Sequence, residues 1–143
     1  MLSTYDVIIR LVLSALLGGL VGIEREVHKR EAGLRTHILV SLGSTLIMLT
    51  SMHIFDIYNY AGGIDPSRIA AGVVTGIGFI GAGTIIRNRE AIKGLTTAAS
   101  IWTVSAIGLA VGCGFISAAC TATILVLLVL LALRNIERVI RKQ

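Results

Sequence analysis

The sequence predicts an all-α membrane protein with five transmembrane helices, and three observations support this fold class. Hydrophobic residues make up 55% of the 143-residue chain, whereas charged residues make up only 15%. Apolar stretches long enough to cross a bilayer as a helix, which takes about 20 residues, occur five times. The strands of a membrane barrel would be shorter and would alternate in polarity. These stretches leave no room for a soluble catalytic domain, so we predict no enzymatic activity.

The five stretches define the predicted spans and a single domain. We place a transmembrane domain at residues 1–133 and a short, basic, amphipathic tail at residues 134–143. The spans lie at about residues 5–23, 36–55, 69–86, 95–111 and 115–133. The first stretch lacks a basic leader and is followed directly by a charge cluster. We therefore expect it to be a retained helix and not a cleaved signal peptide.

The charges between the spans predict the orientation. All of the 13 Lys and Arg residues except Arg10 and Arg68 fall in the first connector, the third connector or the tail. Because loops rich in Lys and Arg stay in the cytoplasm, the N-terminus is expected outside and the C-terminus in the cytoplasm. The formal net charge of +5 then reflects topology and contact with anionic lipid headgroups. It does not indicate nucleic-acid binding, since no motif of that kind occurs.

The third span is distinguished by its glycine content. Five glycines lie between Arg68 and Ile86, and in water each would weaken a helix by about 1 kcal/mol relative to alanine. In lipid, small residues allow helices to approach closely, so we predict tight packing of this span. A helix broken near the midplane, as in transporters, is the alternative. Small residues recur in several spans, and the predicted helix-packing positions are Gly18, Gly22, Gly72, Gly76, Gly78, Gly81, Gly108 and Gly112.

Residues 76–81 of the same span also match the GxGxxG pattern of dinucleotide-binding proteins. That pattern binds pyrophosphate where it follows a strand and opens the helix of a soluble domain. Here an apolar helix is predicted on both sides of the pattern. We therefore favour helix packing over nucleotide binding.

Hydroxyl-bearing residues form two polar stripes within the spans. Thr96, Ser100 and Thr103 share one face of the fourth span, at i, i+4 and i+7. Two such stripes in a small bundle are expected to face each other or a partner subunit. Hydroxyls in lipid usually form hydrogen bonds to their own helix or to a neighbouring one. The alternative is that these hydroxyls line a site for an ion or a partner. The second stripe follows the second span and consists of His37, Ser41, Ser44, Met48 and Ser51.

The connector between the first and second spans mixes both charge signs. Glu24 and His28, like Glu26 and Arg30, have the i,i+4 spacing that favours pairing on a helical extension. Binding of a cation or a partner is the alternative, although Glu24 and Glu26 point to different faces and would form a poor metal clamp. Arg10, inside the first span, either snorkels to the outer interface or has a functional role.

Several blocks of sequence resemble the MgtC/SapB family of bacterial inner-membrane proteins. The blocks are GIERE at residues 22–26, AGLRT at 32–36, RIAA at 68–71, TGIGFIGAG at 75–83 and GLTTAASIW at 94–102. The resemblance implies a five-helix membrane domain linked to magnesium, to adaptation to low magnesium and, in pathogens, to virulence. Some members have asparagine where this chain has Thr96. The virulence members carry a C-terminal ACT-like domain, which we expect this chain to lack.

We therefore expect a non-enzymatic, multi-pass protein of the bacterial inner membrane that is linked to magnesium homeostasis. Regulation of another membrane complex or of the membrane potential is favoured. Transport of magnesium or another cation is the alternative, although no predicted span has a carboxylate at its midplane to hold a dehydrated Mg²⁺ ion. No cofactor is expected beyond an interaction with Mg²⁺.

The expected contacts are the lipid bilayer, further copies of the chain in a homodimer or higher homo-oligomer, and a membrane-protein partner, with no nucleic acid. The expected site lies toward the cytoplasmic side, where the fold can gather the ends of several spans. Its candidate residues are Glu24, Arg25, Glu26, Arg35, Arg68, Arg87, Thr96, Thr97 and Ser100.

Overall fold

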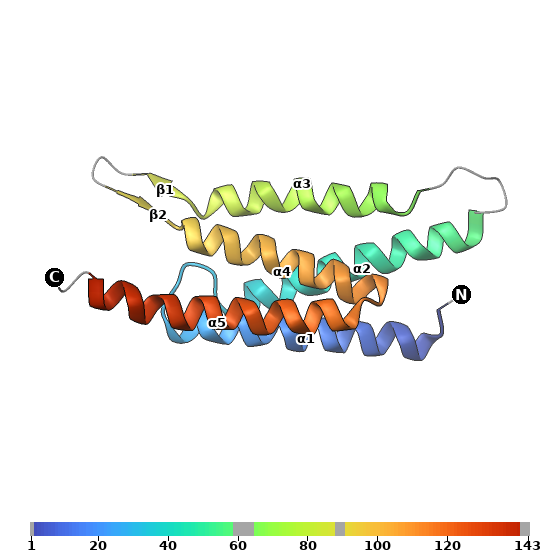
Figure 1. Ribbon diagram of the computed structural model, residues 1–143. Helices are drawn as coiled ribbons and strands as arrows, with labels where there is room; N and C mark the ends of the chain where they lie inside the picture. Colours follow the sequence, from blue (N-terminus) through green and yellow to red (C-terminus); the bar gives the residue numbers. More distant parts are fainter. Residues whose placement is uncertain (1, 59–64, 88–90, 141–143) are drawn as a thin grey trace.

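The computed structural model describes residues 2–58, 65–87 and 91–140, with side chains up to residue 132. In these ranges, five helices and one short hairpin form an elongated bundle (Figure 1). The helices are α1 (Thr4–Val27), α2 (Leu34–Tyr58), α3 (Ser67–Gly83), α4 (Leu95–Cys113) and α5 (Ile116–Ile140), and the strands are β1 (Ile86–Arg87) and β2 (Ile92–Lys93). The predicted all-α class with five helices is confirmed, whereas the orientation in the membrane stays a prediction.

The helices cover the five predicted spans with small differences at their ends. α1, α2 and α4 are long and apolar enough to cross a membrane, whereas α3 and the 116–132 segment of α5 are apolar but shorter. α3 is one unbroken helix that ends at Gly83, before the predicted end at Ile86, and the strands β1 and β2 follow it. α5 continues to Ile140, so the predicted boundary between span and tail lies inside one helix.

Local sequence explains several helix ends. Ser3 caps α1, because its hydroxyl accepts the Asp6 N–H at 3.2 Å while the Asp6 carboxylate accepts the Ser3 N–H at 3.1 Å. The turn between α4 and α5 is made by Gly114, whose φ of +87° lies in the left-handed region that favours glycine. Gly94, immediately before α4, has the same φ. These residues set where α1, α4 and α5 begin or end.

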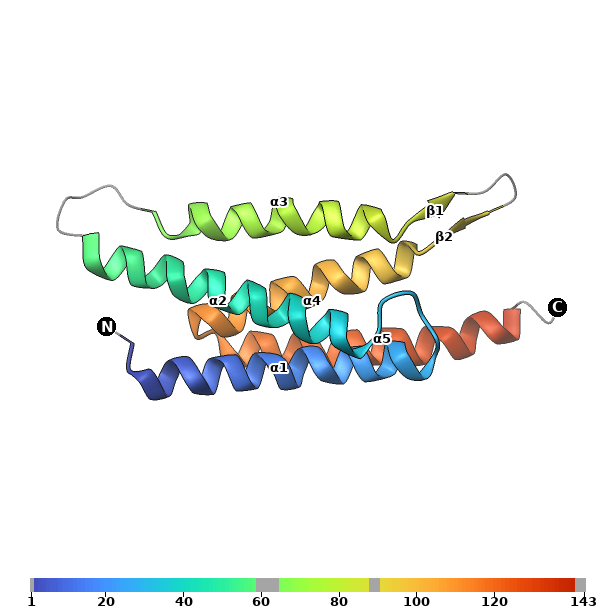
Figure 2. The ribbon, with the colours of Figure 1, turned by 180° about the vertical axis from the view of Figure 1, so that it is seen from behind.

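α4 is the central helix of the bundle, because it packs against all four other helices. The two ribbon views place α3 along one outer edge, where it packs on α4 and α2 (Figures 1 and 2). The main apolar core lies between α1, α4 and α5 and includes the buried side chains of Val21, Val104, Ile107 and Val111. This arrangement leaves much of the surface of α3 open.

The predicted helix-packing glycines on α1 and α4 lie where α2 approaches. A Cβ atom at Gly18 would lie 2.7 Å from the Ser41 Cβ, and one at Gly22 would lie 2.8 Å from the Leu34 Cα. Gly108 and Gly112 on α4 are equally tight against α2. α1 and α4 therefore pack closely against α2 at these four positions.

The glycines of α3 behave differently. A Cβ atom at Gly72, Gly76 or Gly78 would meet no described atom of another segment within 4 Å, and one at Gly81 would make only an ordinary contact of 3.6 Å with Ala98. The predicted tight packing of α3 is therefore wrong within this chain. The physical reason is position, since α3 lies at the edge of the bundle and leaves open space beside its small residues.

Candidate functional site

A chain of buried hydroxyl groups joins α1, α2 and α4 in the middle of the bundle. Ser14 Oγ on α1 lies 2.8 Å from Ser41 Oγ on α2. Thr45 Oγ1 on α2 lies 2.7 Å from Ser14 Oγ and donates to the carbonyl oxygen of Gly108 at 2.7 Å. Buried hydroxyls are stable when they have such partners. The central part of the bundle is thus polar but closed by its own hydrogen bonds.

The two predicted polar stripes meet only in part. Ser44 on α2 lies 2.9 Å from Ser105 on α4, and His37 on α2 lies 3.0 Å from Ser100 on α4, measured between side-chain atoms. Thr96 and Thr103 of the α4 stripe instead line a groove between α4 and α5, which Ser100 also lines. The α2 stripe therefore faces α4 as predicted, whereas the α4 stripe faces mainly α5.

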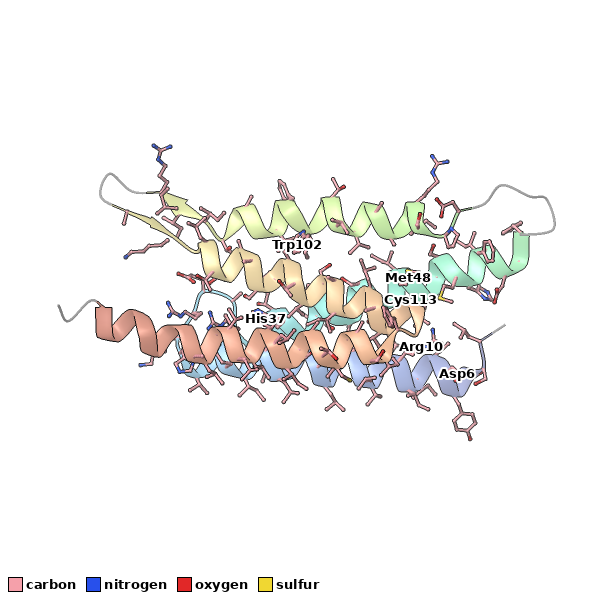
Figure 3. All side chains as sticks on the ribbon, viewed as in Figure 1. Asp6, Arg10, His37, Met48, Trp102 and Cys113 are labelled. Atoms are coloured by element: carbon pink, nitrogen blue, oxygen red, sulfur yellow. The ribbon has the colours of Figure 1, made fainter. Side chains whose placement is uncertain are left out.

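His37 is fully buried at the end of this polar interior that lies toward the β-hairpin (Figure 3). Gly22 makes room for it, because a Cβ at Gly22 would lie 3.1 Å from the His37 Cβ. The Nδ1 atom donates to the carbonyl oxygen of Gly33 at 2.8 Å, and Nε2 lies 3.0 Å from Ser100 Oγ. Ser100 Oγ is also 2.8 Å from the carbonyl oxygen of Thr97. The imidazole thus connects the start of α2 to α4.

An ion pair at the end of α1 lies near His37. Glu24 is 7% exposed and Arg25 is 2% exposed, and the Arg25 Nε donates to the Glu24 carboxylate. His28 Nδ1 lies 2.9 Å from the other carboxylate oxygen, which confirms the predicted i,i+4 pair. Buried charges are costly unless they are paired, so the loss of either partner would be strongly unfavourable. Arg25 and Glu24 are also the charged groups that act electrostatically on His37.

Two carboxylates fix the loop between α1 and α2. Glu26 accepts the Leu34 N–H at 3.0 Å, which places a negative charge at the N-terminus of α2. Glu31 reaches α4, where the Thr97 hydroxyl donates to its carboxylate at 2.7 Å. This hydrogen bond is the main reason that the pKa of Glu31 lies below its ordinary value. Glu26 therefore caps α2. Its spacing in the sequence had instead predicted a pair with Arg30.

The structure gathers some of the predicted site residues and separates others. Glu24, Arg25, Thr97 and Ser100 surround His37, either directly or through one hydrogen-bonded neighbour. Arg68 lies in the first turn of α3, at the opposite end of the bundle, and so is apart from this group (Figure 1). The remaining predicted residues are exposed: Glu26, Arg35, Arg87 and Thr96.

His37 and Glu31 were not among the predicted site residues, although both belong to the group. The sequence placed His37 in the polar stripe of α2 but did not indicate which atom it would meet. Its contact with Ser100 joins positions 63 residues apart, and the contact of Glu31 with Thr97 joins positions 66 apart. No spacing rule within one helix can indicate such pairs.

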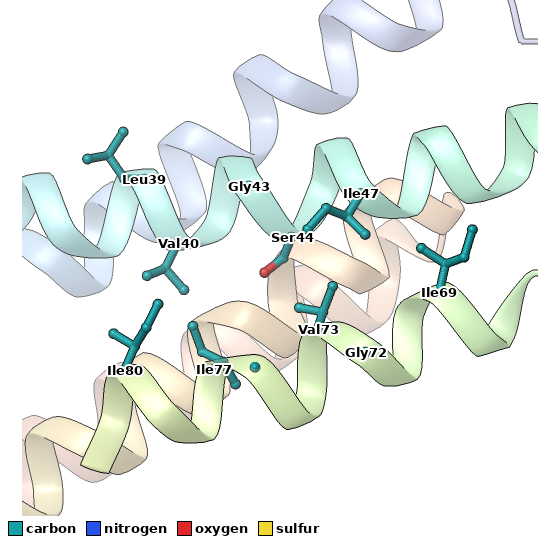
Figure 4. Close-up of a pocket in the computed structure, with 11 residues that line it drawn as sticks. Leu39, Val40, Gly43, Ser44, Ile47, Ile69, Gly72, Val73, Ile77 and Ile80 are labelled. Carbon is teal, nitrogen blue, oxygen red and sulfur yellow. The ribbon is translucent and has the colours of Figure 1, made fainter. Parts of the chain in front are cut away.

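A second feature of the molecule is an apolar groove of about 540 Å³ between α2 and α3 (Figure 4). Gly43 on α2 and Gly72 and Gly76 on α3 line it together with aliphatic side chains and with Ser44, whose hydroxyl is hydrogen-bonded to Ser105. The groove exists partly because the glycine positions lack side chains. An apolar wall offers no oxygen ligands to a cation. The groove therefore suits a hydrocarbon surface and not an ion.

The chemistry available near His37 limits what can bind there. Among the described residues, no three His, Cys, Asp or Glu side chains lie close enough together to hold a metal ion. The carboxylates of Glu24 and Glu31 are already occupied by Arg25, His28 and Thr97. A divalent cation would therefore have to compete with these partners and would not enter a preformed cage.

These features define a helical membrane protein: the helices are apolar, the polar interior is closed, and charged side chains gather near one end. The chain belongs to the MgtC family, whose family model matches residues 11–139. It is thus a bacterial membrane protein, and the resemblance identified in the sequence is confirmed. No solved structure matches the chain.

Curated relatives agree with this assignment. The chain is 48% identical to "Putative magnesium transporter YhiD" of Escherichia coli (strain K12) over 129 residues, which cover 89% of this chain and 60% of that protein. It is 41% identical to "Protein MgtC" of Brucella abortus (strain 2308), covering 90% of this chain and 51% of that protein. It is 40% identical to "Protein MgtC" of Salmonella typhimurium (strain LT2), covering 92% of this chain and 54% of that protein. The chain thus spans half to three-fifths of the length of these relatives.

Proposed function

We propose that this chain is a non-enzymatic protein of the bacterial inner membrane that is linked to magnesium and regulates another membrane complex or the membrane potential. The family and the name of the Escherichia coli relative support the link to magnesium. The helices that are long and apolar enough to cross a bilayer support a multi-pass location. The carboxylates around His37 are the part of the molecule that a divalent cation would affect.

The observation that carries the regulatory role is the state of the polar interior. The buried hydroxyls of Ser14, Ser41, Thr45 and Ser44 are hydrogen-bonded to one another or to α4. Magnesium gives up its water reluctantly and is held by carboxylates and waters. A path for it would need open, hydrated oxygen ligands along the bundle. A closed interior with carboxylates near one end favours sensing over conduction.

In the proposed mechanism, magnesium weakens contacts between helices at this end of the bundle. Glu31 joins the α1–α2 loop to α4 through Thr97, and its carboxylate is exposed to solvent. A divalent cation at this carboxylate competes with the Thr97 hydroxyl and frees the loop. Low magnesium then leaves the loop fastened to α4, and the two states present different surfaces to a partner protein.

A homodimer or higher homo-oligomer is part of the proposal. The exposed side of α3, where Gly72 and Gly76 also line the groove beside α2, is rich in small residues such as Thr75 and Gly78. Phe79 projects from it at 86% exposure. In lipid, such faces allow a second helix to approach closely. The lipid bilayer is the other expected contact, and a membrane-protein partner would complete the regulatory unit.

Catalysis is not part of the proposal, although Ser100 and His37 are within hydrogen-bonding distance. A nucleophilic serine needs access to substrate and donors that stabilise the developing oxyanion. Ser100 is 4% exposed in the interior of α4, and His37 is fully buried. Backbone N–H groups at such a position are used by the helix. The pair therefore serves to connect α2 and α4.

Transport of magnesium is the second candidate function, supported by the name of the Escherichia coli relative. Purified protein in liposomes loaded with a magnesium-sensitive dye separates the two functions. The regulatory proposal expects magnesium entry no faster than in protein-free liposomes. Saturable entry that depends on the protein would overturn it in favour of transport.

The regulatory proposal is tested in a bacterial strain that depends on this protein for growth in low magnesium. Glu31→Gln removes one exposed charge and should impair growth without reducing the amount of protein in the membrane. Arg68→Gln, at the opposite end, is the matched control and should grow like wild type. Normal growth of the Glu31→Gln strain would contradict a role for this carboxylate. Equal impairment of both strains would show that the effect is not local to the group around His37.

A further inference from the structure

We propose that His37 is a proton-binding site that exchanges its proton through the Ser100 hydroxyl with water in the groove between α4 and α5. The proposal goes beyond the magnesium-linked function and does not depend on it. It rests on a count of hydrogen atoms around the imidazole, on the burial of the ring, and on the groove that Ser100 lines.

Two short contacts are made by the ring and a third by its neighbour Ser100, and each requires one hydrogen. The carbonyl oxygen of Gly33 only accepts, so Nδ1 must carry a proton to make its 2.8 Å contact. The carbonyl oxygen of Thr97 also only accepts, so the Ser100 hydroxyl must donate to make its 2.8 Å contact. The 3.0 Å contact between Nε2 and Ser100 Oγ then needs a proton on Nε2. All three contacts form together only when His37 is a cation.

A neutral His37 satisfies a different set of partners. With its one proton on Nδ1, the ring still donates to Gly33, and Nε2 becomes an acceptor. The Ser100 hydroxyl then turns from the Thr97 carbonyl to Nε2. The same heavy-atom positions therefore support two proton arrangements, and Ser100 changes its acceptor when His37 gains or loses a proton.

Ser100 also provides the route for the proton. His37 has no exposed surface, whereas Ser100 lines a groove of about 320 Å³ between α4 and α5. On the α4 side the groove is also lined by the hydroxyl-bearing Thr96 and Thr103, and on the α5 side by aliphatic side chains. A hydronium ion in this groove gives a proton to Ser100 Oγ while the original hydroxyl proton moves to Nε2. The products are water, an unchanged serine and an imidazolium, so the step balances and reverses without another reactant.

Burial of the ring and the charge of Arg25 oppose an added proton, whereas the Gly33 carbonyl and the charge of Glu24 favour it. Glu24 and Arg25 on α1 form a pair of zero net charge, and Glu31 supplies a carboxylate near α4 through Thr97. The sequence of α4 contains no Asp, Glu, Lys, Arg or His, and none occurs in residues 116–132 of α5. Histidine is the side chain whose charge ordinarily changes between about pH 5 and 8.

The test is NMR spectroscopy of the full chain, labelled with ¹⁵N at its three histidines, in lipid nanodiscs between about pH 5 and 8. The spectrum of His37→Gln identifies the His37 signals. The proposal expects the neutral ring to carry its proton on Nδ1, which free histidine does not favour, and Nε2 to gain a proton reversibly as the pH falls. A neutral ring protonated on Nε2, or a ring that does not titrate, would overturn it.

The role of Ser100 is tested by proton-exchange rates from the same spectra. Ser100→Ala should slow exchange at Nε2 by about tenfold or more, because the hydroxyl relay is lost. Ser105→Ala is the matched control, since Ser105 lies on the same helix and its hydroxyl contacts Ser44 and not His37. Ser100→Thr keeps a hydroxyl and should restore fast exchange. Unchanged exchange in folded Ser100→Ala would refute the relay. If that variant does not fold, the tautomer and titration of the wild-type ring still decide the binding site.

Discussion

The guanidinium group of Arg10 on α1 donates a hydrogen bond of 2.7 Å to the carbonyl oxygen of Gly112, 102 residues later in the chain. Gly112 lies in the last turn of α4, where carbonyl groups lack helical partners and carry partial negative charge. Arg10 and Cys113 lie together near the end of the bundle that holds the N-terminus (Figure 3). This arginine therefore connects α1 to the α4–α5 turn. From the sequence alone, snorkelling to the outer interface and a functional role were the two interpretations.

Replacing Arg10 by methionine should destabilise the bundle by about 1–3 kcal/mol, because the carbonyl group loses a charged donor. The midpoint of unfolding in mixed micelles with increasing SDS measures the change. Arg68→Met is the control, since Arg68 is exposed and should change stability by less than about 0.5 kcal/mol. Equal stability of Arg10→Met and wild type would show that the hydrogen bond is not formed in solution.

The two groups of glycines should respond in opposite ways to alanine. A Cβ at Gly108 would overlap the carbonyl oxygen of Ser41, so Gly108→Ala should cost about 1–3 kcal/mol as α4 is pushed from α2. Gly76→Ala adds the same methyl group in open space and should leave the single chain as stable or more stable, by up to about 1 kcal/mol. The same SDS titration compares the variants. A larger loss for Gly76→Ala than for Gly108→Ala would contradict the described packing.

The fold was predictable because its signals are local. The length and apolar character of each stretch indicated the five helices, and the spacing of small residues indicated Gly18, Gly22, Gly108 and Gly112. The same spacing failed on α3, because composition cannot tell whether a small residue faces the bundle or the lipid. That distinction depends on the place of the helix in the bundle, which no local pattern contains.

The site was less predictable than the fold. Glu24 and Arg25 were identified because charged residues end an apolar stretch, and Thr97 and Ser100 because they belong to a hydroxyl-rich start of α4. The residue that links them, His37, was seen as one member of a stripe. Its importance comes from contacts to Gly33 and Ser100. Such contacts depend on the packing of α2 against α4 and so require the tertiary structure.

The hydrogen bond between Glu31 and Thr97 should make the stability of the loop depend on pH. Because the pKa of Glu31 is lowered in the folded chain, mainly by the Thr97 hydroxyl, its contribution is present above the unfolded pKa and is lost as the pH falls through the folded pKa. Thr97→Val should therefore weaken the loop at neutral pH by about 0.5–1 kcal/mol, a low value because the carboxylate is exposed.

Hydrogen exchange of the loop amides at Arg30–Gly33 measures this effect. The difference between wild type and Thr97→Val should shrink below about pH 4.3, the ordinary pKa of glutamate, and disappear at lower pH. Thr103→Val, whose hydroxyl bonds its own helix at Ala99, is the control and should not change the loop. A difference that is independent of pH would mean that Thr97 acts by packing alone.

The predicted orientation, with the N-terminus outside, rests on the charge asymmetry and is tested with reporter fusions. An alkaline phosphatase, which is active only outside the cytoplasm, should be inactive when fused after Gln143. The same reporter should be active when inserted between Tyr58 and Asp65, because this connector has no Lys or Arg. A fluorescent protein that folds in the cytoplasm should give the complementary pattern. Activity at the first position and none at the second would reverse the orientation.

The open face of α3 should mediate association of two copies in the membrane. A Cβ at Gly76 would meet no described atom of another segment within 4 Å, and the residue lines an open groove, so Gly76→Leu should leave the fold of the single chain intact. In a dimer that packs through this face, the larger side chain would hold the two backbones apart. It should lower the dimer fraction by reducing the association constant about tenfold, a loss of about 1.4 kcal/mol. Energy transfer between labelled copies in liposomes measures that fraction, and SDS titration checks the fold.

The control for this experiment is Ala106→Leu, a similar enlargement at an exposed position of α4. It should preserve association, because α4 does not take part in the proposed contact through this residue. Phe79→Ala, which removes the side chain that projects at 86% exposure from α3, should weaken association alongside Gly76→Leu. If neither α3 variant changes the dimer fraction, the small residues of α3 face lipid. Any oligomer must then form through another helix.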